Sequence, residues 1–78
     1  MHTVRVGKVR DVGLVIKTVR ESRGVTQQDL AESLAFSRDY LIDLENGRSN
    51  LYVTRLFRTL NELGVTVALQ YEATDGDA

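Results

Sequence analysis

Apolar residues near the start of the chain follow the spacing of a helix. The positions i, i+3, i+4 and i+7 of an amphipathic helix are met by Val12, Val15, Ile16 and Val19. Asp11 is suited to the N-cap, and Gly24 is suited to the left-handed residue after the last turn. This pattern predicts a helix over residues 11–23.

Two short helices follow, separated by a break at residues 35–37. Thr26 and Asp29 have the spacing of a capping box, with Thr26 as the N-cap of the first of these helices. Ser37 is expected to cap the second, over residues 38–46. The residues expected to face the core are Leu30, Ala31, Leu34, Leu41 and Leu44.

The last third of the chain predicts a fourth helix and then a strand. The helix ends at Gly64 and has the most regular apolar stripe of the chain: Val53, Leu56, Phe57, Leu60 and Leu63. Beyond Gly64 the period changes to two, which predicts a half-buried strand over residues 65–72. Its apolar positions are Val65, Val67, Leu69 and Tyr71. We expect residues 73–78 to form a disordered acidic tail.

The predicted strand needs a partner, because the backbone polar groups of a lone strand have no hydrogen bonds. Two partners are compatible with the sequence: segment 3–6 of the same chain, or the same strand of a second copy. Gly7 and Lys8 weaken the alternation of the first segment, so we favour the second copy.

The composition also favours self-association. With 78 residues, folding hides only about 60% of the surface of the unfolded chain, so small domains often need disulfides, a metal or a partner subunit. The sequence has no Cys and one histidine, His2, near the end of the chain. We therefore expect no metal site and no cofactor, and a homodimer.

The net charge of −1 hides an uneven distribution. Residues 1–25 hold six Lys or Arg against two Asp or Glu, whereas residues 26–50 hold two against five. No apolar run reaches the roughly 18–20 residues of a membrane span, and no signal-peptide pattern opens the chain, so we expect a cytoplasmic protein without membrane contact. An enzyme is not expected, because the sequence has no Cys and one histidine near its end, and the domain is too small to enclose a pocket.

The segment TQQDLAESLAFSRDYLIDLENGR, residues 26–48, resembles the DNA-binding domains of the Xre, or lambda-repressor-like, family. The shared pattern is a helix with Thr-Gln and Leu-Ala, a turn, and a second helix that ends in Glu-x-Gly. The resemblance covers about residues 11–64. It implies a mainly α, four- to five-helix helix-turn-helix domain, which would associate with the nucleoid. With the C-terminal strand paired across a homodimer, the chain divides into an N-terminal arm 1–10, the helix-turn-helix domain 11–64, the dimerising strand 65–72 and the tail 73–78.

Two residues depart from the family pattern. Ala35 occupies a turn position where the family usually has Gly, and Leu51 stands where the family has Pro. A left-handed Ala costs about 1 kcal/mol, so we expect this turn to be reshaped.

The strand VTVALQYE directly after the fourth helix narrows the resemblance to HipB-type antitoxins, whose C-terminal strands pair across the dimer. This resemblance implies a repressor of its own operon that also binds a HipA-like kinase toxin. Two alternatives stay open. One is a stand-alone Xre regulator without a toxin, and the other is a protein-interaction adaptor that has lost DNA binding, which the acidic segment 26–50 makes conceivable.

The second short helix is expected to enter the major groove of double-stranded operator DNA, with a dimer reading an inverted repeat. The expected base contacts are Arg38, Asp39, Tyr40 and Asp43. An Arg fork matches guanine, and an Asp accepts from cytosine N4. Ile42 is either a thymine-methyl contact or a core residue. The expected phosphate contacts are Gln27, Gln28, Ser37, Asn46, Arg48 and Ser49, of which the resemblance supports Gln27 and Asn46.

The resemblance also implies a structural role for two charged residues. Arg20 and Glu45 occupy positions that form a partly buried ion pair between the first and third helices of this family. The planar guanidinium of Arg suits such a pair.

Overall fold

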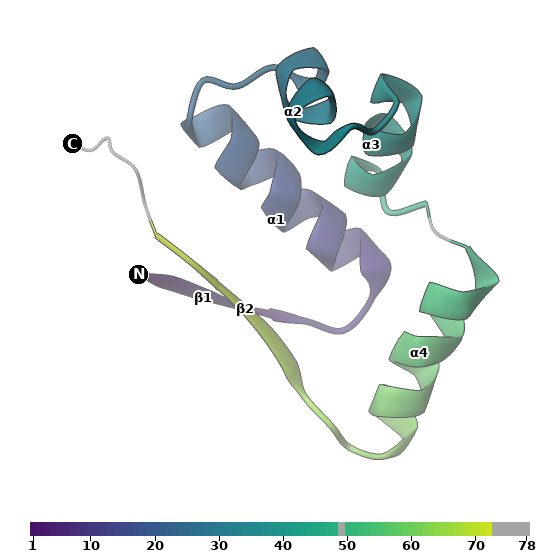
Figure 1. Cartoon of the computed structure of the whole chain (residues 1–78). Helices are drawn as coiled ribbons and strands as arrows, with labels where there is room; N and C mark the ends of the chain where they lie inside the picture. The colour runs from purple at the N-terminus through teal and green to yellow at the C-terminus, as the bar shows by residue number, and fades with distance from the viewer. Residues whose placement is uncertain (49, 73–78) are drawn as a thin grey trace.

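The computed structural model describes residues 1–48 and 50–72, which form four helices and two strands (Figure 1). In chain order these are β1 His2–Val6, α1 Val9–Ser22, α2 Gln27–Leu34, α3 Arg38–Glu45, α4 Leu51–Glu62 and β2 Val67–Tyr71. The mainly α fold is the predicted one. The N-terminal arm expected over 1–10 contains β1 and the first two residues of α1, and the expected tail 73–78 lies outside the described residues.

Side-chain caps set the starts of three helices. Thr26 Oγ1 accepts a hydrogen bond from the backbone N–H of Asp29 at 3.1 Å, and Ser37 Oγ accepts one from Tyr40 N–H at 3.1 Å. Both predicted caps are therefore confirmed. Asn50 caps α4 in the same way, through its side-chain oxygen.

The start of α1 differs from the prediction. The helix begins two residues early, with Lys8 as an N-cap that makes no side-chain cap bond. Asp11 lies inside the first turn, where its Oδ2 accepts a hydrogen bond from Gly7 N–H at 2.9 Å. A carboxylate in this turn also interacts favourably with the positive end of the helix dipole. Asp11 thus stabilises the start of the helix from within the first turn.

The partner of β2 corrects our preferred pairing. β2 pairs antiparallel with β1 of the same chain, with Val6 opposite Val67, Val4 opposite Leu69, and His2 opposite Tyr71. Gly7 and Lys8, which we took to weaken the N-terminal pattern, lie beyond the strand and connect it to α1. In the five residues before them, His2–Val6, polar and apolar side chains alternate over 3–6, and the backbone groups form hydrogen bonds with one edge of β2. Val65 lies outside the strand and is 46% exposed.

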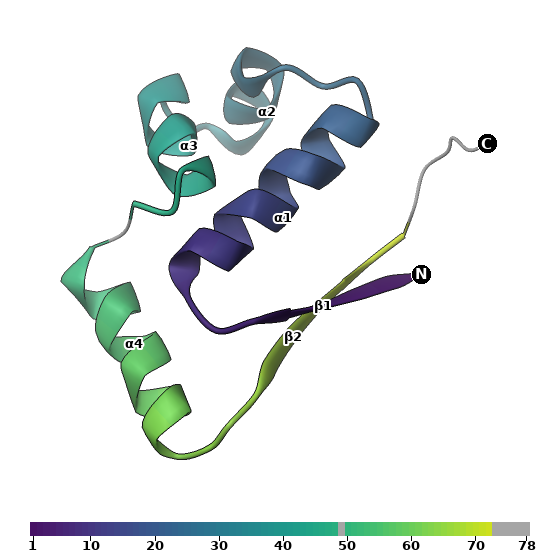
Figure 2. The same ribbon diagram turned by 180° about the vertical axis from the view of Figure 1, so that it is seen from behind.

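Helix α1 lies at the centre of the fold. Figures 1 and 2 show it between the α2–α3 pair and the two-stranded sheet, with α4 at the edge of the molecule. The buried apolar side chains among the described residues are Val6, Val9, Ala31 and Leu41. None of the helices that the structure describes is long and apolar enough to cross a membrane.

Three leucines expected in the core are instead exposed. Leu34 and Leu56 are each 47% exposed, and Leu63 is 70% exposed. Leu34 is the last residue of α2, Leu56 lies on α4, which contains no buried residue, and Leu63 directly follows that helix. Helical periodicity therefore identified the apolar faces of the helices, but the rest of the domain leaves parts of these faces exposed.

Candidate nucleic-acid interface

Helices α2 and α3 are joined by a tight turn at Ala35. Ala35 has a φ of 59° and a ψ of 35°, so the predicted reshaping of this turn is wrong. Its N–H donates to Glu32 C=O at 3.2 Å, and Phe36 N–H donates to Ala31 C=O at 2.9 Å. This pair of bonds is a Schellman motif, which needs a left-handed residue. Ala35 therefore adopts the left-handed conformation that Gly usually adopts at this position of the family, although its Cβ makes that conformation less favourable.

The base-reading residues predicted for α3 are exposed. Arg38, Asp39, Tyr40 and Asp43 all lie on the solvent side of the helix, whereas Leu41 is only 1% exposed. Ile42 is half-buried, which leaves both of its predicted roles open. The outer surface of α3 thus presents one guanidinium, one phenol and two carboxylates to the solvent. This combination of groups is suited to hydrogen bonding with base edges.

Tyr40 is positioned by an aromatic neighbour that the sequence reasoning missed. The rings of Phe36 and Tyr40 meet edge to face, with centroids 5.2 Å apart, and both rings are about half exposed. Phe36 lies in the turn between α2 and α3. A large aromatic residue inside the short turn at residues 35–37 was the signal in the sequence. This contact restricts the orientation of the Tyr40 ring at the edge of the α3 surface.

Asp43 and Arg48 lie side by side, although we expected one to contact bases and the other to contact phosphate. Arg48 Nη1 is 3.4 Å from Asp43 Oδ1, and both side chains are more than half exposed. In this geometry the cation of the α3–α4 loop partly neutralises the carboxylate of α3. A surface pair of this kind contributes little to stability, so either side chain is able to change its partner at little cost.

The predicted phosphate-contacting residues are found in several environments. Gln27 is half-buried, and its Nε2 donates to Glu45 Oε1 at 3.0 Å. The Gln28 amide donates to Glu32 at 2.8 Å and stays exposed. Ser37 caps α3, and Asn46 is exposed at its C-terminus. Ser49 lies outside the described residues.

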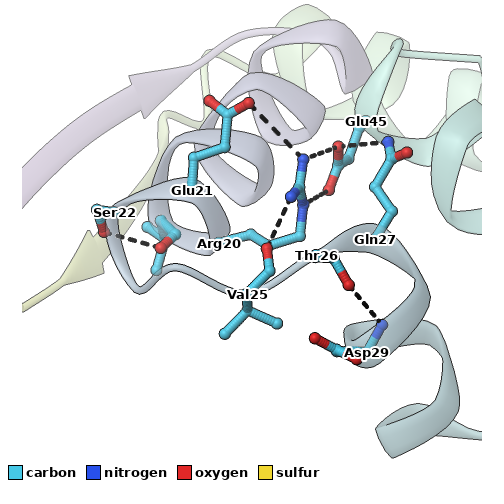
Figure 3. Close-up of polar contacts among 9 residues, drawn as sticks. Arg20, Glu21, Ser22, Val25, Thr26, Gln27, Asp29 and Glu45 are labelled. Carbon is cyan, nitrogen blue, oxygen red and sulfur yellow. Dashed lines mark hydrogen bonds and ion pairs between the residues drawn. The ribbon is translucent and has the colours of Figure 1, made fainter.

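The ion pair expected between α1 and α3 is present (Figure 3). Arg20 Nε donates to Glu45 Oε2 at 2.6 Å, and Arg20 Nη2 donates to Oε1 at 3.0 Å. The third guanidinium nitrogen donates to the Val25 carbonyl at 2.8 Å. The side chains are only 9% and 2% exposed, and Gln27 completes the cluster. One buried network therefore fixes α1, the α1–α2 loop, the start of α2 and the end of α3.

The network changes the protonation of both charged members. Hydrogen bonding to Arg20 lowers the pKa of Glu45 below its ordinary value of 4.5, although desolvation acts in the opposite direction. The same hydrogen bond raises the pKa of Arg20. Glu45 is therefore ionised at neutral pH, and the charges of the pair stay balanced inside the domain.

The described residues contain no group of three or more His, Cys, Asp or Glu side chains that is able to hold a metal ion.

Comparison with known proteins agrees with this architecture. The family model described as a helix-turn-helix domain matches residues 13–71. The immunity repressor protein of Bacillus phage phi105 is 40% identical over 57 residues, which is 73% of this chain and 40% of that repressor. The uncharacterized HTH-type transcriptional regulator y4dJ of Sinorhizobium fredii (strain NBRC 101917 / NGR234) is 36% identical over 55 residues, 70% of this chain and 71% of that protein. No solved structure matches the chain. Because the match to the family model runs from α1 to β2 and includes α2, the turn and α3, this chain belongs to the helix-turn-helix domain family, of the Xre-like kind.

Proposed function

We propose that this chain is a sequence-specific DNA-binding transcription repressor that places α3 in the major groove of its operator. The observation that carries the proposal is the exposed polar surface of α3. The opposite side of this helix packs in the core through the buried Leu41. The family match and the printed names of both relatives, one a repressor and one a transcriptional regulator, support the same function.

In this proposal the roles are divided by chemistry. Arg38 pairs with guanine O6 and N7, while Asp39 and Asp43 accept hydrogen bonds from cytosine N4. The phosphates are contacted by Arg48, by the exposed polar side chains around α3, and by the first backbone N–H groups of α2. Two carboxylates that face phosphates repel them. Binding to random DNA is therefore weak, and sequence dependence is strong.

The proposal includes a homodimer. One α3 reads only a half-site, and two copies related by a two-fold axis read an inverted repeat with half-sites about 34–36 Å apart, or a multiple of that distance.

The experiment that tests this function is selection of bound sequences from a random duplex library with the full chain. We expect an enriched inverted repeat, and Arg38→Ala should abolish the enrichment. Arg5→Ala removes an exposed cation from β1 and serves as the matched control, which should retain the enriched sequence. Recovery of no enriched sequence by the unaltered chain would contradict the proposal. That result, with protein partners recovered instead, would favour the adaptor role that the acidic segment 26–50 suggests.

A HipB-type antitoxin remains the narrower form of this proposal. It rests on the strand after α4, which in this chain pairs with β1. Neither relative is named as an antitoxin, so a stand-alone regulator is the better-supported form. Co-purification from the native host distinguishes the two, because an antitoxin should bring a kinase-like protein with it.

A further inference from the structure

Helix α4 carries a row of exposed apolar side chains next to its half-buried face. Val53, Phe57 and Leu60 are half-buried against the rest of the domain. Beside them, Leu56 is 47% exposed, and Leu63, the residue directly after the helix, is 70% exposed. None of the twelve residues of α4 is fully buried, whereas α1, α2 and α3 each contain at least one buried residue. The helix therefore has a second apolar surface that its own chain leaves uncovered.

The exposed row has the spacing of a helix-pairing seam. Its members are separated by four, three and four residues, and they are Tyr52, Leu56, Thr59 and Leu63. This is the repeat that keeps side chains facing a neighbouring helix. Tyr52 is 79% exposed. The Thr59 hydroxyl donates to the backbone carbonyl of Arg55 at 2.8 Å, so its polar group is satisfied within the helix and its methyl group is left for packing.

Two opposite charges flank the seam on one side. Arg55 directly precedes Leu56, and Glu62 directly precedes Leu63, so each occupies the same position relative to a seam leucine. Both side chains are exposed, and neither has an ion-pair partner within residues 1–48 and 50–72. Charges at such flanking positions set the partner and the orientation of paired helices.

We propose that a second copy of this chain covers the seam, with the two α4 helices antiparallel. In this register Tyr52 packs against Leu63 of the second copy, and Leu56 packs against Thr59 of the second copy. Arg55 then lies opposite Glu62 of the second copy, and the two-fold axis generates the same pair again. A parallel pairing brings no opposite charges together at these positions. The charge pattern thus favours an isologous dimer of this chain over an unrelated partner.

The seam and the proposed DNA-binding side chains lie on different helices, α4 and α3. Figures 1 and 2 show α4 at the edge of the molecule, with α3 between it and α2. In such a dimer the α4 surface would hold the two α3 helices on one inverted repeat of DNA. This consequence for DNA binding rests on the proposed function. The pairing itself does not depend on DNA.

Charge exchange on the full chain tests the register. Sedimentation equilibrium over a wide range of protein concentrations, without DNA, should show a monomer–dimer equilibrium for the unaltered chain. Arg55→Glu and Glu62→Arg should each weaken dimerisation at least about tenfold, because each turns two attractive pairs into repulsive ones. An equimolar mixture of the two variants should form a heterodimer, and the double variant should dimerise like the unaltered chain. Circular dichroism checks that every variant is folded.

Arg23→Glu is the matched control, since it makes the same charge change at an exposed residue directly after α1, outside α4, and it should leave the dimer intact. A chain that is monomeric at every concentration overturns the proposal. So do single variants that dimerise normally, as they would if the open edge of β2 formed the interface, and so does a mixture without heterodimers. DNA binding is measured separately, so its absence would contradict the repressor function without affecting the dimer.

Discussion

Gly13 of α1 lies against the backbone of α3 at Leu44. A Cβ on Gly13 would lie 2.3 Å from the Leu44 carbonyl oxygen and 2.8 Å from that of Glu45. Such distances are far below van der Waals contact, so only a glycine lets the two helices approach this closely. Arg20 lies two turns further along the same face of α1, and the close approach brings its guanidinium to Glu45. The crossing of α1 and α3 and their ion pair are therefore coupled.

Gly13→Ala should destabilise the domain strongly. The added methyl group meets backbone atoms, which cannot rotate away, so α1 and α3 must separate and strain or break the buried ion pair. Overpacking of this kind costs about 1–3 kcal/mol or more. Urea denaturation followed by circular dichroism measures the change. Gly7→Ala is the control, because nothing lies within 4 Å of its Cβ position. Equal stability of the two variants would show that the helices adjust without cost.

Glu45→Ala should lower the thermal stability much more than Asp43→Ala. Removal of Glu45 leaves the buried Arg20 guanidinium without its counter-charge, at a cost of about 3–5 kcal/mol. The Asp43–Arg48 pair is exposed and contributes less than about 1 kcal/mol. Thermal unfolding of both variants at neutral pH tests the order. The reverse order would mean that the buried pair contributes nothing to stability.

The lowered pKa of Glu45 makes the stability depend on pH in one direction. The Glu45 carboxylate binds a proton less readily in the folded state than in the unfolded state. Its contribution to the free energy of unfolding is therefore fully present above the unfolded pKa, near 4.5. It is lost as the pH falls through the lower pKa of the folded state. We expect the free energy of unfolding to decrease below about pH 4.5. Glu45→Gln should make this decrease shallower, and an unchanged slope would assign it to other carboxylates.

The sequence predicted the helices and the α2–turn–α3 unit because their signals are local. Thr26 and Ser37 act on N–H groups three residues away, and the family pattern located Arg20 and Glu45. Longer-range features were harder to predict. The pairing of β1 with β2 joins the two ends of the chain, and two short alternating segments do not specify which copy they pair with. The contact of Gln27 with Glu45 depends on how the start of α2 packs against the end of α3, which no spacing in the sequence encodes.

Ala35→Gly should stabilise the domain. The left-handed φ of 59° is costly for a residue with a Cβ, and the penalty of about 1–2 kcal/mol exceeds the extra freedom that glycine gives the unfolded chain. A gain of up to about 1 kcal/mol is expected from urea denaturation. Gly24→Ala makes the opposite change at a φ of 67°, where no atom lies within 4 Å of a Cβ, so it should destabilise through the backbone alone. A loss of stability in Ala35→Gly would show that the methyl group of Ala35 packs favourably.

Asp39→Asn and Asp43→Asn should reduce sequence discrimination while they strengthen binding to random DNA. Each change keeps the shape of the side chain but removes a carboxylate that repels phosphate. Each change weakens a base contact, because a charged acceptor becomes a neutral amide oxygen, and full loss of such a contact costs about 1–3 kcal/mol of discrimination, roughly five- to 150-fold in the ratio of the two dissociation constants. Fluorescence anisotropy with the selected sequence and with a shuffled duplex of the same composition measures that ratio. Glu72→Gln, directly after β2, makes the same charge change away from α3 and should leave the ratio unaltered. If both Asp variants keep the original ratio, the carboxylates of α3 do not face the bases, and α3 is docked on DNA in another orientation.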